Sequence, residues 1–574
     1  MTLRNFCSLV LVGQMLLAQQ APKPLEAKVA APDPQWDRLY PNEKIMEFLR
    51  GYAKAYPDWV KLESIGKTGF GGDTWLLTIT NPKTGPAESK PAVYIDGATH
   101  ANEVQGTEVC VYTIGFLLKN YGKLPRVTEF LDRATVYAIP MMNYDSRDIW
   151  FKRPSTPNYP RTLPAHIDDD RDGEADEDGY DDLDGDGEIT MMRKKVPLGQ
   201  GNFRLDPKDP RILRPVGPGE LGDYIQLGTE GLDNDGDGQV NEDLMGYVDP
   251  NRAWGEGWMP RYVQSGSSDY PLQYPEQRNI AEWARKHENI NVVLSYHNFG
   301  RWILRGPGAK PQRQMNPGDV RVHDFLGKEG EKMLPGYRYG SSWALLYDSY
   351  GDTTDHFYGR HGAFSTVVEL SGPVADVNND KQVSPEEQMK FNDEMTQGRM
   401  FVEFKPFKHP TYGEIEVGGM RHDTNRTPEG FMATEEFHRN AMFMLFHGYH
   451  LPKLKFGEPT VTKVKEGLYR IHQPVLNERM IPTLSAIVAQ NKVHRQDEVT
   501  LTGGKVIASG VVTDPFANRV QVQENRPERL VVNGGVGGTE TKTFMLLVEA
   551  KPGKVTLTYD GVKAGKHSTT ITLP

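Results

Sequence analysis

Short apolar runs alternate with amphipathic stretches between residues 42 and 372. The run PAVYIDG at 91–97 is typical of a buried strand, and the apolar spacing at 103–122 predicts an amphipathic helix. Further strands are predicted at 60–66, 74–80, 134–143, 291–297 and 364–372, and further helices at 42–56 and 275–287. Because helices alternate with apolar strands, the pattern predicts an α/β fold with a mixed, largely parallel sheet flanked by helices. Such a sheet places functional residues at the carboxyl ends of its strands.

The pattern changes twice along the chain and predicts several regions. Between Asn143 and Asn251 the sequence is rich in Pro, Gly and Asp and has little apolar periodicity. From about Leu454, short alternating runs are separated by turn residues, which predicts an all-β sandwich. We therefore divide the chain into a signal peptide at 1–21, a main domain at 22–405 with an insert at 144–250, a bridging segment at 406–453 and a β-sandwich at 454–574.

The N-terminus has the pattern of a secretory signal peptide. Arg4 supplies a positive charge, residues 6–17 are mostly apolar, and a small residue, Ala18, follows. The apolar run is too short to span a membrane, and no other stretch is long and apolar enough to do so. The alternative is an N-terminus that is disordered or associated with a membrane. We expect a secreted or periplasmic protein without an internal disulfide, since removal of the signal leaves only Cys110.

Negative charge is concentrated in one segment of the insert. The formal net charge of the chain is −11, and residues 168–188 alone contain ten Asp, three Glu and one Arg, which give −12. The remainder of the chain is close to neutral. The charge distribution therefore argues against a nucleic-acid partner.

Three stretches of the insert resemble the beginning of a calcium-binding loop. Each has Asp at alternate positions followed by Gly, a pattern in which carboxylate oxygens converge on a hard cation and Gly permits the sharp turn. None has Glu at the twelfth position, so a complete EF-hand is not expected. The alternative is a set of solvated acidic loops. The candidate calcium ligands are Asp168, Asp170, Asp172, Asp182, Asp184, Asp186, Asp233, Asp235 and Asp237.

Histidine and glutamate residues follow three of the predicted buried strands. His100 and Glu103 lie between a strand and a helix, and His297 ends an apolar strand in VLSYHNFG. Two His and one Glu with an open fourth position form the ligand set of a catalytic zinc site. Glu369 ends another strand in STVVELSG and is a carboxylate that could accept a proton from water in such a site. For each histidine taken alone, a buried structural role is the alternative.

Several ordered motifs resemble the zinc metallocarboxypeptidases of the pancreatic carboxypeptidase A and B type. HANE is similar to the segment with the family's first two zinc ligands, here His100 and Glu103, and SYHN to the segment of the third, His297. DPNRAWG is similar to the family's Asn-Arg pair, here Asn251 and Arg252, which binds the terminal carboxylate of the substrate. An arginine fork suits a carboxylate, and the amide adds a neutral donor. The resemblance implies a carboxypeptidase-like fold and zinc as the cofactor.

The resemblance covers roughly residues 40–405 and implies further catalytic roles. YDSYGDTTDHFYG is similar to the family's mobile tyrosine segment, so Tyr347 is expected to close over the bound substrate. Glu369 takes the place of the catalytic glutamate, the general base on a metal-activated water. The oxyanion arginine is expected at Arg153, with Arg161 as the alternative, because NYDSRDIWFKRP departs from the family pattern at this step.

The resemblance also identifies the residues that select the C-terminal side chain of the substrate. The position at the base of the pocket is Thr354, directly before Asp355, and Val367 is expected to line the same pocket. Because Thr is neutral, we expect a neutral or apolar C-terminal residue. The predicted function is a secreted zinc carboxypeptidase that acts on the C-termini of peptides or proteins.

Two other functions remain open from the sequence. A hydrolase of similar fold could remove an acyl group from an amino acid or cleave a peptidoglycan stem peptide. A catalytically silent binding or adhesion protein is the second alternative, although such a protein would be expected to lose the metal ligands or the glutamate. The sequence does not define the natural substrate, the role of the C-terminal β domain or the oligomeric state.

Overall fold

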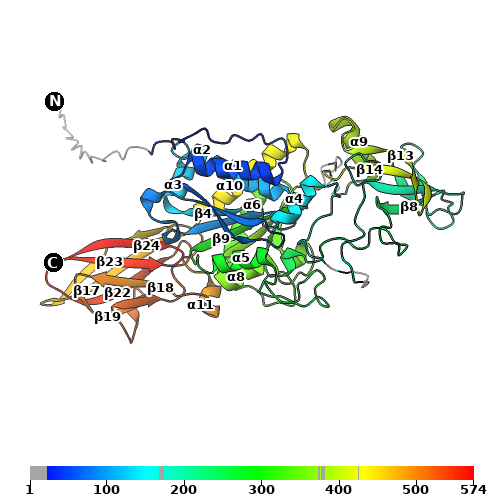
Figure 1. Ribbon diagram of the computed structural model, residues 1–574. Helices are drawn as coiled ribbons and strands as arrows, with labels where there is room; N and C mark the ends of the chain where they lie inside the picture. The colour runs from blue at the N-terminus through cyan, green and yellow to red at the C-terminus, as the bar shows by residue number, and fades with distance from the viewer. Residues whose placement is uncertain (1–21, 167, 169–172, 373–374, 377–381, 425) are drawn as a thin grey trace, which may run out of the picture.

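A computed structural model describes residues 22–166, 168, 173–372, 375–376, 382–424 and 426–574, so the predicted signal peptide lies outside the described residues. An eight-stranded sheet of order β1-β2-β4-β3-β9-β12-β10-β11 forms the centre of the molecule (Figure 1). Strands β4, β3, β9 and β12 run parallel, and antiparallel pairs join them to both edges. The predicted α/β fold with a mixed sheet is thus confirmed. The strands are β1 (Val60–Lys67), β2 (Asp73–Ile79), β3 (Ala92–Gly97), β4 (Thr135–Ile139), β9 (Ile290–Asn298), β10 (Trp302–Arg305), β11 (Arg338–Ser341) and β12 (Phe364–Leu370).

Helices cover both faces of this sheet (Figure 1). Val93 and Ile95 of β3 face the first helical layer, and Tyr94 between them faces the second. Because both faces are covered, every residue of β3 and β9 is buried, which explains why these strands read as continuous apolar runs. The first layer contains α1 (Asn42–Ala55), α2 (Gln105–Asn120), α3 (Pro125–Arg133), α6 (Pro317–Met333) and α10 (Gly430–Tyr449), and the second α5 (Pro275–Ala284) and α8 (Thr353–His361).

Residues 406–453, expected to bridge two domains, are instead part of two folded units. The expected boundary at residue 405 falls inside β13 (Phe401–His409), and α10 packs against α2. Phe437 and Phe443 of α10 are fully buried in the main core. The aromatic-rich helix is visible in the sequence, but the sheet face that it covers is set by tertiary packing.

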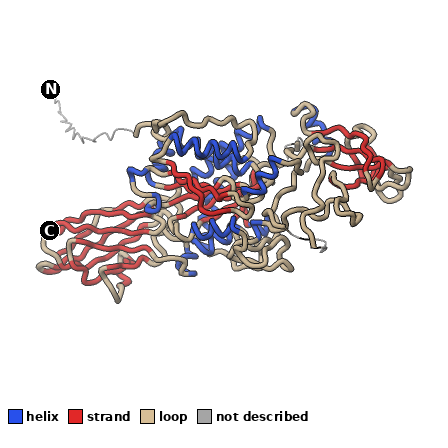
Figure 2. The backbone as a smooth tube through the Cα atoms, in the orientation of Figure 1, coloured by secondary structure: helices blue, strands red, loops and turns tan. Residues whose placement is uncertain are grey.

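The insert forms a second sheet with the strands that follow the main domain. Its order is β13-β14-β5-β8-β6-β7, and its described pairings are antiparallel. Figure 2 shows this sheet at one end of the molecule and the C-terminal sheets at the other. The strands not yet given are β5 (Met191–Lys195), β6 (Phe203–Leu205), β7 (Leu213–Pro215), β8 (Tyr224–Thr229) and β14 (Gly413–Met420), with α9 (Pro385–Met395) beside them in Figure 1.

The C-terminal region forms two antiparallel sheets that share one apolar core. It contacts the main domain through Lys563, whose Nζ donates to the carbonyl of Ile290, and through Ser485 Oγ, which donates to Gly362 O at 2.7 Å. Its elements are β15 (Leu454–Phe456), β16 (Thr460–Lys465), β17 (Leu468–Asn477), α11 (Ala486–Asn491), β18 (Asp497–Thr502), β19 (Lys505–Asp514), β20 (Arg519–Val522), β21 (Arg529–Val532), β22 (Thr541–Glu549), β23 (Gly553–Gly561) and β24 (Gly565–Leu573).

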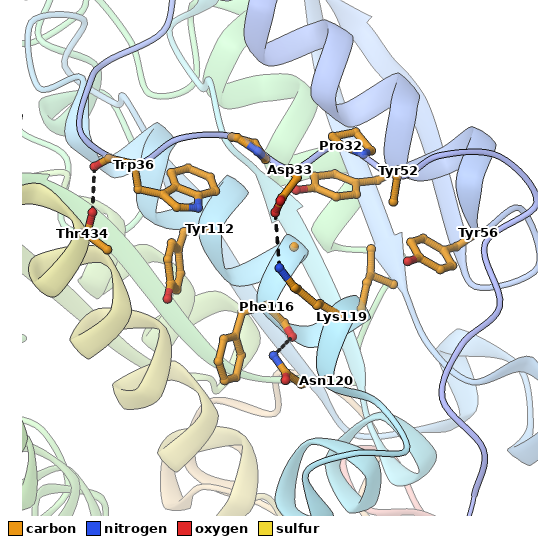
Figure 3. Close-up of a pocket in the computed structure, with 14 residues that line it drawn as sticks. Pro32, Asp33, Trp36, Tyr52, Tyr56, Tyr112, Phe116, Lys119, Asn120 and Thr434 are labelled. Carbon is orange, nitrogen blue, oxygen red and sulfur yellow. Dashed lines mark hydrogen bonds and ion pairs between the residues drawn. The ribbon is translucent and has the colours of Figure 1, made fainter.

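The N-terminal segment runs along α1 and α2 and leaves an aromatic pocket (Figure 3). Asp33 pairs with Lys119 at 3.3 Å, and the rings of Trp36 and Tyr112 lie 5.1 Å apart. None of the residues predicted to form a functional site lines this pocket. In the described part of the chain, no helix is both long and apolar enough to cross a membrane.

Candidate metal centre and substrate cleft

Three neighbouring parallel strands bring the predicted metal ligands together at their carboxyl ends. His100 and Glu103 lie in the turn between β3 and α2, and His297 lies at the end of β9. Glu369 of β12 is the register partner of His297 on the adjacent strand. The four residues therefore meet although almost 270 positions separate the first from the last.

Close backbone approach holds the turn after β3 against β9. A Cβ atom on Gly97 would lie 2.3 Å from the carbonyl carbon of Gly106, and a Cβ on Gly106 would lie 2.6 Å from the carbonyl oxygen of Tyr296. Only glycine fits both positions without a backbone shift. This contact fixes the distance between the His100–Glu103 turn and the end of β9.

The ligand atoms of His100, Glu103 and His297 converge on one point. His100 Nδ1 lies 2.9 Å from one carboxylate oxygen of Glu103, His297 Nδ1 lies 3.0 Å from the other, and the two Nδ1 atoms are 3.2 Å apart. Ligands of a tetrahedral zinc ion are separated by about 3.3 Å, given bonds of roughly 2.0–2.1 Å. All three residues are buried. Two nitrogens and one oxygen at this spacing fit a zinc ion.

Asp249, which was not predicted, and Arg161, the alternative for the oxyanion role, both contact the ligands. Asp249 Oδ1 lies 2.9 Å from His100 Nε2, the ring nitrogen that faces away from the convergence point. A carboxylate there orients the imidazole and its lone pair. Arg161 Nη1 donates to Glu103 at 2.6 Å. In the sequence, the only feature that could have pointed to Asp249 is its position two residues before Asn251 in DPNR.

The charges around Glu103 keep it ionised. Burial opposes ionisation, but the charges of His100 and Arg161 and hydrogen bonds from both histidines hold the pKa of Glu103 well below its usual value. Asp249 behaves in the same way, because His100 and Arg252 outweigh burial and lower its pKa strongly. Both carboxylates are therefore charged at neutral pH, as a metal ligand and its orienting group require.

Glu369 differs from its neighbours because no cationic side chain among the described residues forms an ion pair with it. Burial and the adjacent charge of Glu103 raise the pKa of Glu369 to about 7, against weaker opposite effects of His297 and nearby arginines. It lines the same cavity as His100. A carboxyl group with a pKa near neutrality can accept a proton and return it within one reaction cycle.

Asn251, Arg252 and Tyr347 line the same cavity as the metal centre. Asn251 Oδ1 accepts hydrogen bonds from the Thr353 amide and hydroxyl at 2.9 and 3.0 Å, which fixes the orientation of its side-chain amide. Arg252 Nη2 donates to the Tyr347 hydroxyl at 3.2 Å. Tyr347 is 56% exposed, and its ring lies over the Arg252 guanidinium, 5.8 Å from ring centroid to Cζ. Together, Arg252, Asn251 and Tyr347 offer guanidinium, amide and phenol donors to an anion.

Thr354 and Val367 lie in the same cavity, with Leu304 and Leu346 as further apolar walls. Asp352 also lines it and was not predicted. Its carboxylate begins α8 and accepts hydrogen bonds from the Asp355 amide at 2.9 Å and the Thr354 hydroxyl at 2.7 Å, as well as from a serine. The pocket therefore combines apolar walls with an acidic group that is already hydrogen-bonded.

Arg153, the first choice for the oxyanion role, lies elsewhere. It is exposed and follows the last residue of α4 (Tyr144–Lys152). Arg161, the alternative, lines the cavity beside His100 and Glu103. The structure therefore corrects this prediction. The cause is the loop from 153 to 161, whose irregular path carries no periodic signal in the sequence.

The Asp-rich stretches bring some of their carboxylates together. Among the described residues of these stretches and their neighbours, three groups have ligand oxygens within 4.8 Å of one another. In one group, Glu230, which follows β8, joins the predicted ligands Asp182 and Asp184. Asp170 and Asp172 lie outside the described residues, and Asp168 accepts a hydrogen bond from Gly173 N at 3.1 Å. The groups are Asp182, Asp184 and Glu230; Asp233, Asp235 and Asp237; and Asp178, Asp235 and Glu242.

Two family models match the chain. Residues 45–158 and 232–397 match a model described as zinc carboxypeptidase, and these segments contain every predicted zinc ligand and both predicted clamp residues. Arg161 and the Asp-rich segment at 168–188 lie between the two matched segments. Residues 453–572 match a model described as a domain of unknown function.

Curated relatives match the chain over short segments. Carboxypeptidase D of Anas platyrhynchos is 32% identical over 119 residues, which cover 21% of this chain and 9% of that protein. Carboxypeptidase B of Bos taurus is 31% identical over 103 residues, which cover 18% of this chain and 24% of that protein. The chain thus spans well under a third of the length of these relatives.

Solved structures resemble the chain over a larger part of its length. Bovine thrombin-activatable fibrinolysis inhibitor, in complex with tick carboxypeptidase inhibitor, has a TM-score of 0.43 at 16% identity, covering 72% of this chain and 98% of that one. Carboxypeptidase A from Helicoverpa armigera has a TM-score of 0.44 at 15% identity, covering 74% and 76%.

Proposed function

Because the region formed by residues 45–158 and 232–397 belongs to the zinc carboxypeptidase family, we propose that this chain removes the C-terminal residue from peptides or proteins in a zinc-dependent reaction. One observation carries the proposal. His100 of the metal centre, Glu369 and the carboxylate clamp of Arg252 line a single cavity. A hydrolytic centre beside a carboxylate clamp is what cleavage at a free C-terminus requires.

His100, Glu103 and His297 would hold the zinc ion. When bound, zinc acts as a Lewis acid and lowers the pKa of a water ligand toward roughly 7. Arg252 and Asn251 donate hydrogen bonds to the terminal carboxylate of the substrate and thereby orient the scissile peptide bond.

Glu369 moves the proton of the reaction. Its carboxylate accepts a proton from the attacking water as the water oxygen bonds to the carbonyl carbon, and then delivers that proton to the amine nitrogen as the C–N bond breaks. Arg161 donates a hydrogen bond to the oxyanion that develops on the carbonyl oxygen. Tyr347 covers the bound residue and excludes water from the clamp.

The cavity walls support a preference for neutral C-terminal residues. Leu304, Leu346 and Val367 provide apolar contacts, and Thr354 is uncharged. Asp352 accepts hydrogen bonds from its own helix and from a serine, and these contacts engage both of its carboxylate oxygens. Faster release of Lys or Arg than of Leu or Phe would contradict this preference.

A comparison of free and amidated C-termini tests the clamp directly. Wild-type protein should release the last residue from a peptide acid and leave the matching peptide amide intact. Arg252→Gln should reduce kcat/KM for the acid by about 100-fold, since a charge-assisted hydrogen-bond pair contributes roughly 3 kcal/mol. Equal cleavage of acid and amide, or internal cleavage, would contradict an exopeptidase.

Calcium binding by the Asp-rich loops stays a prediction. It is supported by the grouping of Asp182, Asp184 and Glu230, and by the aspartates at 233–237. Calorimetry on protein freed of calcium should detect binding, and Asp184→Asn with Asp235→Asn should abolish it. No heat of binding in wild-type protein would contradict the prediction.

Export is proposed from residues 1–21 alone. The positive residue, the apolar run and the following small residue support a cleaved signal peptide. Mass spectrometry of the N-terminus after expression in an exporting host should find a chain that begins near residue 22. An intact N-terminus retained inside the cell would contradict it.

A further inference from the structure

Arg426 reaches the metal centre from outside the segments that match the zinc carboxypeptidase model. The match ends at residue 397, and Arg426 lies between β14 and α10. Its Nη1 lies 3.8 Å from the Glu103 carboxylate, and its side chain is 23% exposed. Arg426 is therefore an accessible cation beside the ligands, contributed by a part of the chain that the family model does not cover.

Hydrogen bonds fix Arg426 beside the end of β9. Its carbonyl accepts a hydrogen bond from Asn298 Nδ2 at 2.9 Å, and its Nε donates to Asn158 Oδ1 at 3.0 Å. The guanidinium lies over the ring of Phe299, 5.5 Å from its centroid. Asn298 and Phe299 directly follow the metal ligand His297, so the arginine is anchored at the metal centre itself.

The insert also contacts the residues that precede Arg426 in the chain. Glu188, buried at the end of the acidic stretch, accepts hydrogen bonds from the amide of His422 at 3.0 Å and from its ring at 2.6 Å, and pairs with Arg421 at 2.5 Å. Arg399 pairs with Glu429 at 2.6 Å on the other side of Arg426. These contacts tie described residues on both sides of Arg426 to the rest of the protein.

Arg426 and Phe299 lie beside the metal centre but outside the lining of the substrate cavity. The cavity with Arg252, Thr354 and Tyr347 is lined by neither of them. In a carboxypeptidase the last residue of the substrate occupies that cavity and the scissile bond lies at the metal. The preceding residues must therefore leave the cavity past the metal centre, where Phe299 offers an apolar face and Arg426 a charge.

The guanidinium of Arg426 retains donors for a ligand. Among the described residues, its shortest ion pair is the 3.8 Å contact with Glu103, a carboxylate committed to the proposed metal and to Arg161. Its Nε is engaged by Asn158, and its Nη1 lies on the side of the Glu103 carboxylate. A fork of this kind binds a carboxylate with two donors and with a preference over a neutral amide.

We propose that Arg426 and Phe299 form a subsite for an acidic side chain at one of the two peptide residues upstream of the scissile bond. The subsite rests on the proposed carboxypeptidase function. The aromatic ring packs against the aliphatic part of the acidic side chain, and the Arg426 Nη groups bind its carboxylate. The chain would thus favour peptides that end in a neutral residue and carry an acidic residue one or two positions before it.

Matched peptides test this subsite. Two pairs of N-blocked peptides end in Leu and differ only by Glu or Gln, one pair at the penultimate residue and the other one residue further upstream. Wild-type protein should prefer Glu by about 10-fold in kcat/KM at one of these positions, as expected for one charge-assisted contact. The preference should fall as ionic strength rises.

Variants separate the subsite from the catalytic centre. Arg426→Gln should reduce the preference to within about twofold while its zinc content remains near that of wild type. Arg426→Lys should retain part of the preference, because the charge remains without the fork. Arg204→Gln, which removes an exposed arginine of the insert, is the matched control and should keep it in full.

The outcomes distinguish this inference from the function on which it rests. Peptide cleavage without a preference for Glu, or with a preference that survives Arg426→Gln, would overturn the subsite and leave the carboxypeptidase intact. Failure of zinc-loaded wild-type protein to cleave any peptide would overturn both. Loss of zinc in Arg426→Gln would assign the arginine a structural role in the metal centre and would also overturn the subsite.

Discussion

Asp249→Asn tests whether a second carboxylate prepares His100 for metal binding. Asp249 Oδ1 lies 2.9 Å from His100 Nε2 and accepts a hydrogen bond from the Asn251 amide at 2.7 Å. The Nε2 proton is thereby held on the outer side of the ring, and Nδ1 presents its lone pair to the metal. Asparagine keeps the size and one acceptor oxygen but removes the charge.

The expected cost follows from the role of such partners. Loss of an orienting carboxylate weakens metal binding by about 10–100-fold, or roughly 1.4–2.7 kcal/mol. The zinc Kd of Asp249→Asn should rise by that factor in a competition titration against a chelator of known affinity. Its metal-free Tm should stay close to that of wild type if the fold is unchanged.

An exposed aspartate of the same chain region supplies the control. Asp269 is largely exposed and pairs with Arg261 at 3.3 Å. Asp269→Asn should leave the zinc Kd unchanged. If folded Asp249→Asn bound zinc with a Kd within about twofold of wild type, the orienting role would be refuted. This role predicts a Kd that is at least about tenfold higher.

Three further changes test other parts of the account. Gly106→Ala should destabilise the protein by about 1–3 kcal/mol in urea, because its Cβ would meet the Tyr296 carbonyl; unchanged stability would contradict the close contact. The pKa of Glu369 is about 7 in the folded protein against 4.5 in the unfolded chain, so the metal-free protein should lose stability as the pH rises from 4.5 to 7. The stability of Glu369→Gln relative to wild type should therefore be higher at pH 8 than at pH 5, and an equal difference at both pH values would contradict the raised pKa. Burial lowers the pKa of Lys563 from 10.5 to about 7, so stability should rise with pH between these values, and Lys563→Met should flatten that slope; an unchanged slope would contradict the buried amine.

The parts of the fold that the sequence predicts are those with strong periodicity. β3, β9 and β12 contain short apolar runs and are almost entirely buried because helices cover both faces of the sheet. The residues at their ends could be assigned for the same reason. A parallel sheet brings the carboxyl ends of such strands to one edge. His100, His297 and Glu369 could therefore be assigned to one site without knowing the path of the loops between them.

The remaining parts depend on contacts that no local pattern records. Arg153 and Arg161 lie in one irregular loop, and only its three-dimensional path decides which arginine enters the cavity. Residue 405 lies within β13, which pairs with β14, and β14 in turn pairs with β5 of the insert. The domain boundary therefore could not follow composition. Arg426 is an arginine without a motif, and tertiary packing alone brings it to Glu103.

The central claim is that the cavity of His100, Glu103, His297 and Glu369 hydrolyses C-terminal peptide bonds with zinc. The most direct measurement is release of free Leu from a blocked dipeptide acid by zinc-loaded protein, chelator-treated protein and Glu369→Gln. The account predicts release that the chelator abolishes, that added zinc restores, and that Glu369→Gln lowers by at least about 1,000-fold while zinc remains bound. Release that survives metal removal, or full activity of Glu369→Gln, would contradict it.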